Sequence, residues 1–70
     1  MVSVTKRYEN GRFSFILREN GKEKCECFFS PVTAEISEIS VYADITEEEK
    51  KAVDDVIAAV KEGKWLAVRG

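Results

Sequence analysis

The fold of this chain is decided by residues 9–21, which read ENGRFSFILRENG. The stretch begins and ends with the same tripeptide, at Glu9-Asn10-Gly11 and Glu19-Asn20-Gly21, and an alternating apolar run lies between the two copies. Asn-Gly adopts positive φ readily, and between alternating apolar runs it is the strongest short-range signal for a β-hairpin. The two copies therefore predict a three-stranded antiparallel meander over residues 1–29, with strands at 2–8, 12–18 and 23–29.

Parity along these strands predicts the turn types, because residues directly opposite one another in an antiparallel pair lie on the same face. In the first hairpin, a two-residue turn at Asn10-Gly11 places apolar residues opposite one another, pairing Tyr8 with Phe13 and Val4 with Leu17. In the second, a two-residue turn would oppose apolar and charged residues, so we expect a three-residue loop at 19–21 with a bulge at its glycine. That loop pairs Phe15 with Cys25. The expected core face comprises Val4, Tyr8, Phe13, Phe15, Leu17, Cys25, Cys27 and Phe29.

The second half of the chain predicts one strand, one helix and one further strand. A fourth strand is expected over 35–43, with a bulge near Ser37-Glu38 where the apolar alternation shifts. Thr46 followed by Glu49 is typical of a capping box, and Gly63 of a helix end. The apolar helix face is Val53, Val56, Ile57 and Val60.

The predicted fold class is α+β, in a single domain over residues 1–70. One helix packs on one face of a five-stranded antiparallel sheet, and residues 64–69 form the last strand. The expected spatial order is 5-1-2-3-4. Parallel pairing of the last strand beside the fourth, through a right-handed crossover, is the alternative.

The composition excludes several classes of function. The 70 residues contain no histidine, so the commonest general base is absent, and we find no glycine-rich phosphate loop or nucleophile elbow. We therefore expect no enzyme activity and no catalytic residues. Cys25 and Cys27 share one strand face with no histidine to complete a metal site, which predicts buried free thiols and neither metal nor cofactor. No apolar run spans a bilayer, so we expect a cytoplasmic protein without a membrane partner.

Charge divides the chain in two. Residues 1–24 carry six basic and three acidic side chains, whereas residues 25–70 carry five basic and ten acidic ones. A protein partner with a basic surface would meet the acidic half, and such charges mainly accelerate association. Of these acidic residues, Glu35, Glu38, Asp54 and Asp55 are the predicted partner-binding ones.

The sheet face opposite the helix is the other predicted contact surface. Ile16 and Phe28 are expected there as exposed apolar residues among charges such as Arg18, a composition that suits a partner contact or a dimer seam. Trp65, the single tryptophan, is expected on the same face, partly exposed. A homodimer joined through the Ile16/Phe28 face or through an exposed sheet edge is one form that such a contact could take.

Single-stranded nucleic-acid binding is the alternative function. In this hypothesis Arg12, Arg18 and Lys24 neutralise phosphates while Tyr8 and Phe28 stack on bases. Four strands followed by a helix also resemble, in the order of elements, a class of single-stranded-DNA-binding domains.

One further resemblance lies at the end of the helix. The nine residues 60–68, VKEGKWLAV, resemble the helix-Gly-Trp-Leu-strand ending of some small phage anti-CRISPR proteins. The resemblance implies a stoichiometric, non-enzymatic inhibitor. The leading hypothesis is thus a small protein-interaction module, a phage or mobile-element inhibitor that binds a host CRISPR-type complex. The sequence leaves open the partner, the oligomeric state and the choice between the sheet face and the acidic helix face.

Overall fold

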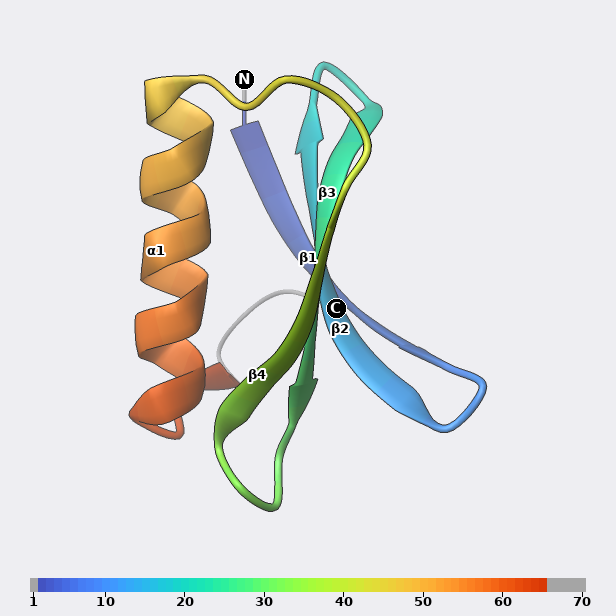
Figure 1. Cartoon of the computed structure of the whole chain (residues 1–70), viewed down its shortest axis with the longest axis vertical. Helices are drawn as coiled ribbons and strands as arrows, with labels where there is room; N and C mark the ends of the chain where they lie inside the picture. Colours follow the sequence, from blue (N-terminus) through green and yellow to red (C-terminus); the bar gives the residue numbers. More distant parts are fainter. Residues whose placement is uncertain (1, 66–70) are drawn as a thin grey trace.

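The computed structural model describes residues 2–65, in which one helix packs along one face of a twisted antiparallel sheet (Figure 1). The sheet consists of β1 (Val2–Glu9), β2 (Arg12–Glu19), β3 (Lys22–Ser30) and β4 (Glu35–Val41), in the spatial order β1-β2-β3-β4. The helix α1 (Glu47–Lys61) follows β4. The α+β class and the antiparallel meander are confirmed. The predicted last strand lies outside the described residues, apart from residues 64 and 65, which are in no strand.

Both Asn-Gly pairs form two-residue turns. Asn10 and Gly11 have φ of 53° and 75°, and Asn20 and Gly21 have φ of 53° and 82°. Positive φ at both central residues defines the type I′ turn, whose twist matches that of the flanking strands. In the first hairpin the register agrees with the prediction, with Tyr8 opposite Phe13.

The predicted three-residue loop of the second hairpin is wrong. Its two-residue turn places Glu19 opposite Lys22, and the register then shifts between Leu17 and Arg18, so that Leu17 lies opposite Cys25. Lys24 is the extra residue, so the bulge that restores the common apolar face lies within β3 instead of in the turn. Phe15 consequently pairs with Cys27 and not with Cys25.

A second bulge lies in β4, where the prediction is confirmed. Phe28 lies opposite Glu38 and Phe29 opposite Ile36, so Ser37 is the extra residue. The bulge returns Ile36 to the face that carries the core, on which Ile39 also lies, opposite Cys27.

The two predicted end signals define the helix. The Thr46 amide donates to Glu49 Oε1 at 2.8 Å, and the Glu49 amide donates to Thr46 Oγ1 at 3.2 Å, which forms the capping box. At the other end Gly63 has φ of 74° and its amide donates to the Val60 carbonyl, while the Lys64 amide donates to the Ala59 carbonyl. This pair of bonds is the Schellman motif, and it turns the chain back toward the sheet.

The core lies between the sheet and α1. The buried apolar residues there are Phe15, Leu17, Cys25, Cys27, Phe29, Val56 and Val60. Five of the eight predicted strand residues are buried, whereas Val4 and Phe13 are partly buried and Tyr8 is exposed. Phe15 and Phe29 stack with ring centroids 4.7 Å apart.

Candidate protein-binding surface

The sheet face opposite α1 exposes only one member of the predicted apolar pair, because Phe28 is partly exposed beneath the Arg12 guanidinium whereas Ile16 is buried. Ile16 is 0% exposed, so the prediction that it forms a contact surface is wrong. It lies at the middle of β2 between Thr5 and Glu26, on a face crowded with long side chains. Ile16 is therefore part of a second, small buried layer beneath polar groups.

Ion pairs and hydrogen bonds join the side chains on this face. Glu23 Oε2 accepts from Arg7 and from Arg18, each at 3.0 Å, and Arg18 also donates to Thr5 Oγ1 at 2.7 Å. The buried Glu26 carboxylate accepts from Ser14 Oγ at 2.6 Å and, through its other oxygen, from the Tyr42 hydroxyl at 2.9 Å. The hydrogen bond to Glu26 raises the pKa of the Tyr42 phenol, because it stabilises the protonated form.

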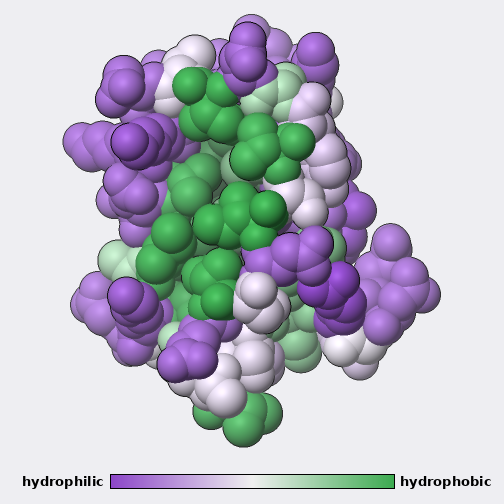
Figure 2. Space-filling model, viewed as in Figure 1, coloured by the Kyte–Doolittle hydropathy of each residue, from purple (hydrophilic) through white to green (hydrophobic). Residues whose placement is uncertain are grey.

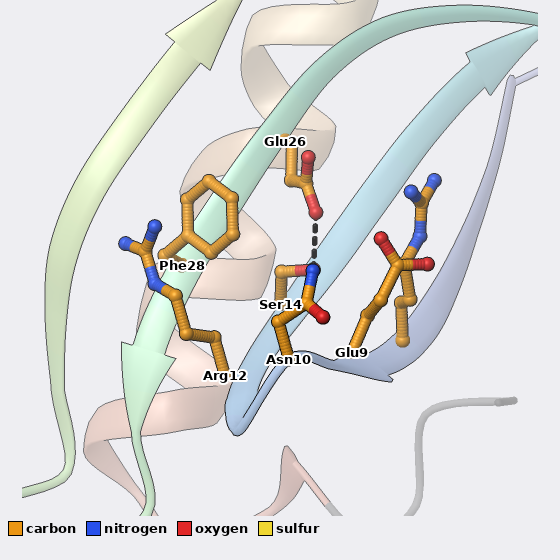
Figure 3. A pocket seen from close by; sticks show the side chains of 7 residues that line it. Glu9, Asn10, Arg12, Ser14, Glu26 and Phe28 are labelled. Carbon is orange, nitrogen blue, oxygen red and sulfur yellow. Dashed lines mark hydrogen bonds between the residues drawn. The ribbon is translucent and has the colours of Figure 1, made fainter.

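A hollow of about 150 Å³ opens on this face beside the first hairpin turn (Figure 3). Its lining residues are Arg7, Glu9, Asn10, Arg12, Ser14, Glu26 and Phe28. The Arg12 guanidinium lies 3.8 Å from the centre of the Phe28 ring and donates to Glu38 Oε1 at 3.0 Å. The hollow thus carries two positive and two negative side chains, and it favours neither a strong anion site nor a strong cation site.

The predicted partner-binding residues do not converge. Arg18, Phe28 and Glu38 lie on the face opposite α1, whereas Asp54 and Asp55 lie exposed on the helix. Glu35 is exposed at the beginning of β4. The basic residues of the nucleic-acid alternative are also separated, because Lys24 Nζ lies 3.5 Å from the buried Glu49 carboxylate at the start of α1.

Trp65 lies on the helix side of the sheet, so the prediction that it faces away from the helix is wrong. Its ring centroid is 5.8 Å from that of Phe13 and 5.5 Å from that of Phe29, and Lys6 Nζ lies 5.6 Å above it. The turn at Gly63 accounts for this placement, since it directs the chain back to the apolar end of the sheet. Trp65 is only partly exposed and packs against the core.

The exposed apolar surface lies instead between β4 and α1. Ile39 is 45% exposed and Val41 is 59% exposed, although both point to the helix side of the sheet. Figure 2 shows apolar side chains running along this face, with strongly hydrophilic residues on the helix side and weakly to strongly hydrophilic residues on the other side. We call this surface the apolar band; its residues are Ile36, Ile39, Val41, Ile45, Val53 and Ile57.

The width of the helix explains why the band is open. A helix with its side chains is about 10–12 Å across. Four strands at a spacing of about 4.8 Å are wider than that, so one helix cannot cover the whole sheet. On the β1 side of α1, Ala52 and Ala59 line a second hollow of about 230 Å³. Val53 and Ile57, one turn apart, therefore face the β4 side.

The sequence contains a signal for the band that the prediction did not use. The alternation of Ile36, Ile39 and Val41 places these residues on the sheet face that the helix packs against, but only one helix follows four strands. An amphipathic strand at the end of such a sheet is the position that the helix leaves uncovered.

The two thiols are free and buried, as predicted. Burial raises the pKa of Cys25 and raises that of Cys27 to about 12, so neither forms a reactive thiolate near neutral pH. Within residues 2–65, no three His, Cys, Asp or Glu side chains are grouped to hold a metal ion. In the same part of the chain, no helix has the length and apolar composition to cross a bilayer.

Comparisons of the chain with protein-family models, with curated proteins and with solved structures find no match.

Proposed function

We propose that this chain is a non-enzymatic protein-interaction module that acts by stoichiometric binding, with the apolar band as its contact surface. The observation that carries the proposal is the exposure of Ile39 and Val41 beside the partly exposed Val53 and Ile57. A contiguous apolar surface bordered by polar side chains has the composition of a protein–protein interface, with an apolar centre and a polar rim.

Charge supports the same function. Asp54 and Asp55 on α1 and Glu35 at the start of β4 are exposed, and none of the ion pairs found among residues 2–65 includes them. Exposed acidic groups increase the association rate with a basic partner even from outside the contact itself, as for Asp55 in the hollow on the β1 side of α1, and salt screens that effect.

The target class that we propose is a host CRISPR-type nuclease complex, which follows from the resemblance of residues 60–68 to anti-CRISPR endings. Cleavage of a target DNA by such a complex, titrated with the protein, tests it. Inhibition should be complete near one equivalent of protein per binding site, because a stoichiometric inhibitor does not turn over.

Nucleic-acid binding receives less support from the geometry. Arg12 pairs with Glu38, Arg18 with Glu23 and Lys24 with Glu49, so carboxylates compete with phosphates for each of the three basic groups. Fluorescence anisotropy with labelled oligonucleotides at low salt tests this alternative directly.

The decisive experiment compares two substitutions of the same type. Val41→Lys places a charge in the apolar band, whereas Val32→Lys places it on a side chain that is 92% exposed in the turn between β3 and β4. Each protein is immobilised, host lysate is passed over it, and the retained proteins are identified. The proposal predicts a stoichiometric partner that wild type and Val32→Lys retain and Val41→Lys loses. Equal retention by all three would exclude the band as the contact surface.

A further inference from the structure

The apolar band borders an open sheet edge. Among the described residues β4 pairs with β3 alone, and the Tyr42 amide donates to the Lys24 carbonyl at 2.8 Å. In an antiparallel pair, alternate residues direct both backbone groups to the same partner strand. Ser40 therefore bonds to β3, whereas the N–H and C=O groups of Ile39 and Val41 point out of the edge.

Within residues 2–65 no strand pairs with these backbone groups, and the same two residues also carry exposed apolar side chains. Natural edge strands usually carry a proline, an inward-pointing lysine or a bulge that prevents another strand from pairing. In β4 the bulge lies at Ser37 and the charged edge residue is Glu38, so the stretch 39–42 after them contains no proline, lysine or bulge. This stretch can accept one more strand.

We propose that a second copy of this chain occupies the edge, through antiparallel pairing of the two β4 strands about a two-fold axis at Ser40. The inference rests on the proposed function, since in the free protein the second copy occupies the same apolar band that the host partner contacts in the complex. Ile39 then lies opposite Val41 of the second copy, and Val41 opposite Ile39. All the outward backbone groups of both residues are paired, and the two sheets become one sheet of eight strands.

The charges select this register over its neighbours. With the axis at Ser40, each Glu38 lies opposite Tyr42 of the second copy, so no like charges meet. An axis at Val41 would place Glu38 opposite Asp44, and two acidic residues directly opposite destabilise a pair. An axis at Ile39 would place Val41 opposite the bulged Ser37 and lose that pairing.

The pairing also covers the apolar band. A two-fold axis perpendicular to the sheet leaves both helices on the same face. The four side chains contributed by Ile39 and Val41 then lie between the two helices, beside Val53 and Ile57. A 70-residue chain has a small core, and burying the band in a dimer enlarges it.

Sedimentation velocity over a range from low micromolar to millimolar tests the association. Wild type and Val32→Lys should shift from monomer to dimer as concentration rises. Val41→Lys should raise the dissociation constant at least ~100-fold, because a two-fold interface contains each substitution twice. Val41 is mostly exposed, so the variant should fold, and its melting curve checks this.

Ser40→Cys tests the register. Opposed residues at a non-hydrogen-bonded position have Cα atoms about 4.5 Å apart, within the disulfide range of about 4.4–6.8 Å. Ser40→Cys should form a covalent dimer under mild oxidation, whereas Ser37→Cys should not. Wild type controls for the buried Cys25 and Cys27.

Three results would overturn the inference: a monomer at millimolar concentration, a dimer unaffected by Val41→Lys, or equal crosslinking of Ser37→Cys and Ser40→Cys. A monomer that still captures a partner through Val41 would exclude the second copy and leave the proposed function intact. A monomer whose captured partners do not depend on Val41 would exclude both.

Discussion

Two Ile→Ala substitutions should have very different effects on stability, although both sites lie in strands. Ile16 is 0% exposed and Ile39 is 45% exposed. Truncation of a fully buried isoleucine removes buried methyl and methylene groups and leaves a cavity, at a cost of about 2–5 kcal/mol. We expect about 3 kcal/mol for Ile16→Ala and about 1 kcal/mol for Ile39→Ala. Alanine also has a lower strand propensity than isoleucine, which destabilises both variants by a similar amount and so largely cancels when the two stability losses are compared.

Urea denaturation followed by far-UV circular dichroism measures the difference. The free energy of unfolding of a domain of this size is roughly 4–10 kcal/mol, at about 0.05–0.15 kcal/mol per residue. Ile16→Ala should therefore strongly lower the urea concentration at which half of the protein is unfolded, without changing how steeply the free energy of unfolding depends on urea. Ile39→Ala should lower that urea concentration only slightly. The proteins are compared at low micromolar concentration, where association does not contribute. Equal losses at the two sites would refute the buried layer on the face opposite α1.

Three further predictions concern the helix start and the core thiols. Thr46→Ala should lower the free energy of unfolding by about 1 kcal/mol through loss of the capping box, as measured by thermal melting, and a neutral substitution would refute the cap. A hydrogen bond from the Thr46 backbone lowers the pKa of Glu49, and the nearby Lys24 lowers it further. The stability that the ionised Glu49 contributes is therefore present above the ordinary pKa of a glutamate, and it is lost as the pH falls through the lowered pKa of Glu49 in the folded protein. In the Glu49→Gln variant the free energy of unfolding should consequently fall less steeply as the pH is lowered. An unchanged fall would contradict the stabilising role of the Glu49 carboxylate. Cys25 and Cys27 should resist Ellman's reagent until the protein unfolds, and rapid labelling of the native protein would show that they are not buried.

The sequence predicted the meander because its signals are local. Asn10-Gly11 and Asn20-Gly21 require positive φ, and that requirement alone fixes two hairpins. The capping box and Gly63 define the helix ends in the same way, through residues within one turn. The bulge at Ser37 was predictable because the shift in the apolar alternation of β4 is visible in the sequence.

The errors arose where two placements satisfy the same pattern. The apolar residues of β2 and β3 lie on the same sheet face either with a bulge at Lys24 or with a three-residue loop at 19–21. The preference of Asn20-Gly21 for a type I′ turn decides in favour of the bulge. The bulge at Lys24 accompanies an ion pair with Glu49, a contact between β3 and α1 that no local pattern contains.

Exposure was harder to predict than position. Alternation placed Ile16 on the correct face, but its burial depends on the long side chains of neighbouring strands. Alternation also placed Ile39 and Val41 on the core side, but their exposure depends on how far one helix extends across the sheet. The candidate surface was therefore missed, because coverage is a property of the packed elements.

Amide hydrogen exchange of β4, followed residue by residue by NMR, tests most directly whether the apolar band is a protein contact. In dilute protein the amides of Ile39 and Val41 should exchange rapidly, since they point out of the sheet edge, while the Ser40 amide is protected by β3. At high protein concentration, the Ile39 and Val41 amides should become protected and the Ser40 amide should stay protected. If the Ile39 and Val41 amides exchange rapidly at every protein concentration, and also when a captured partner is bound, the apolar band is not a protein contact.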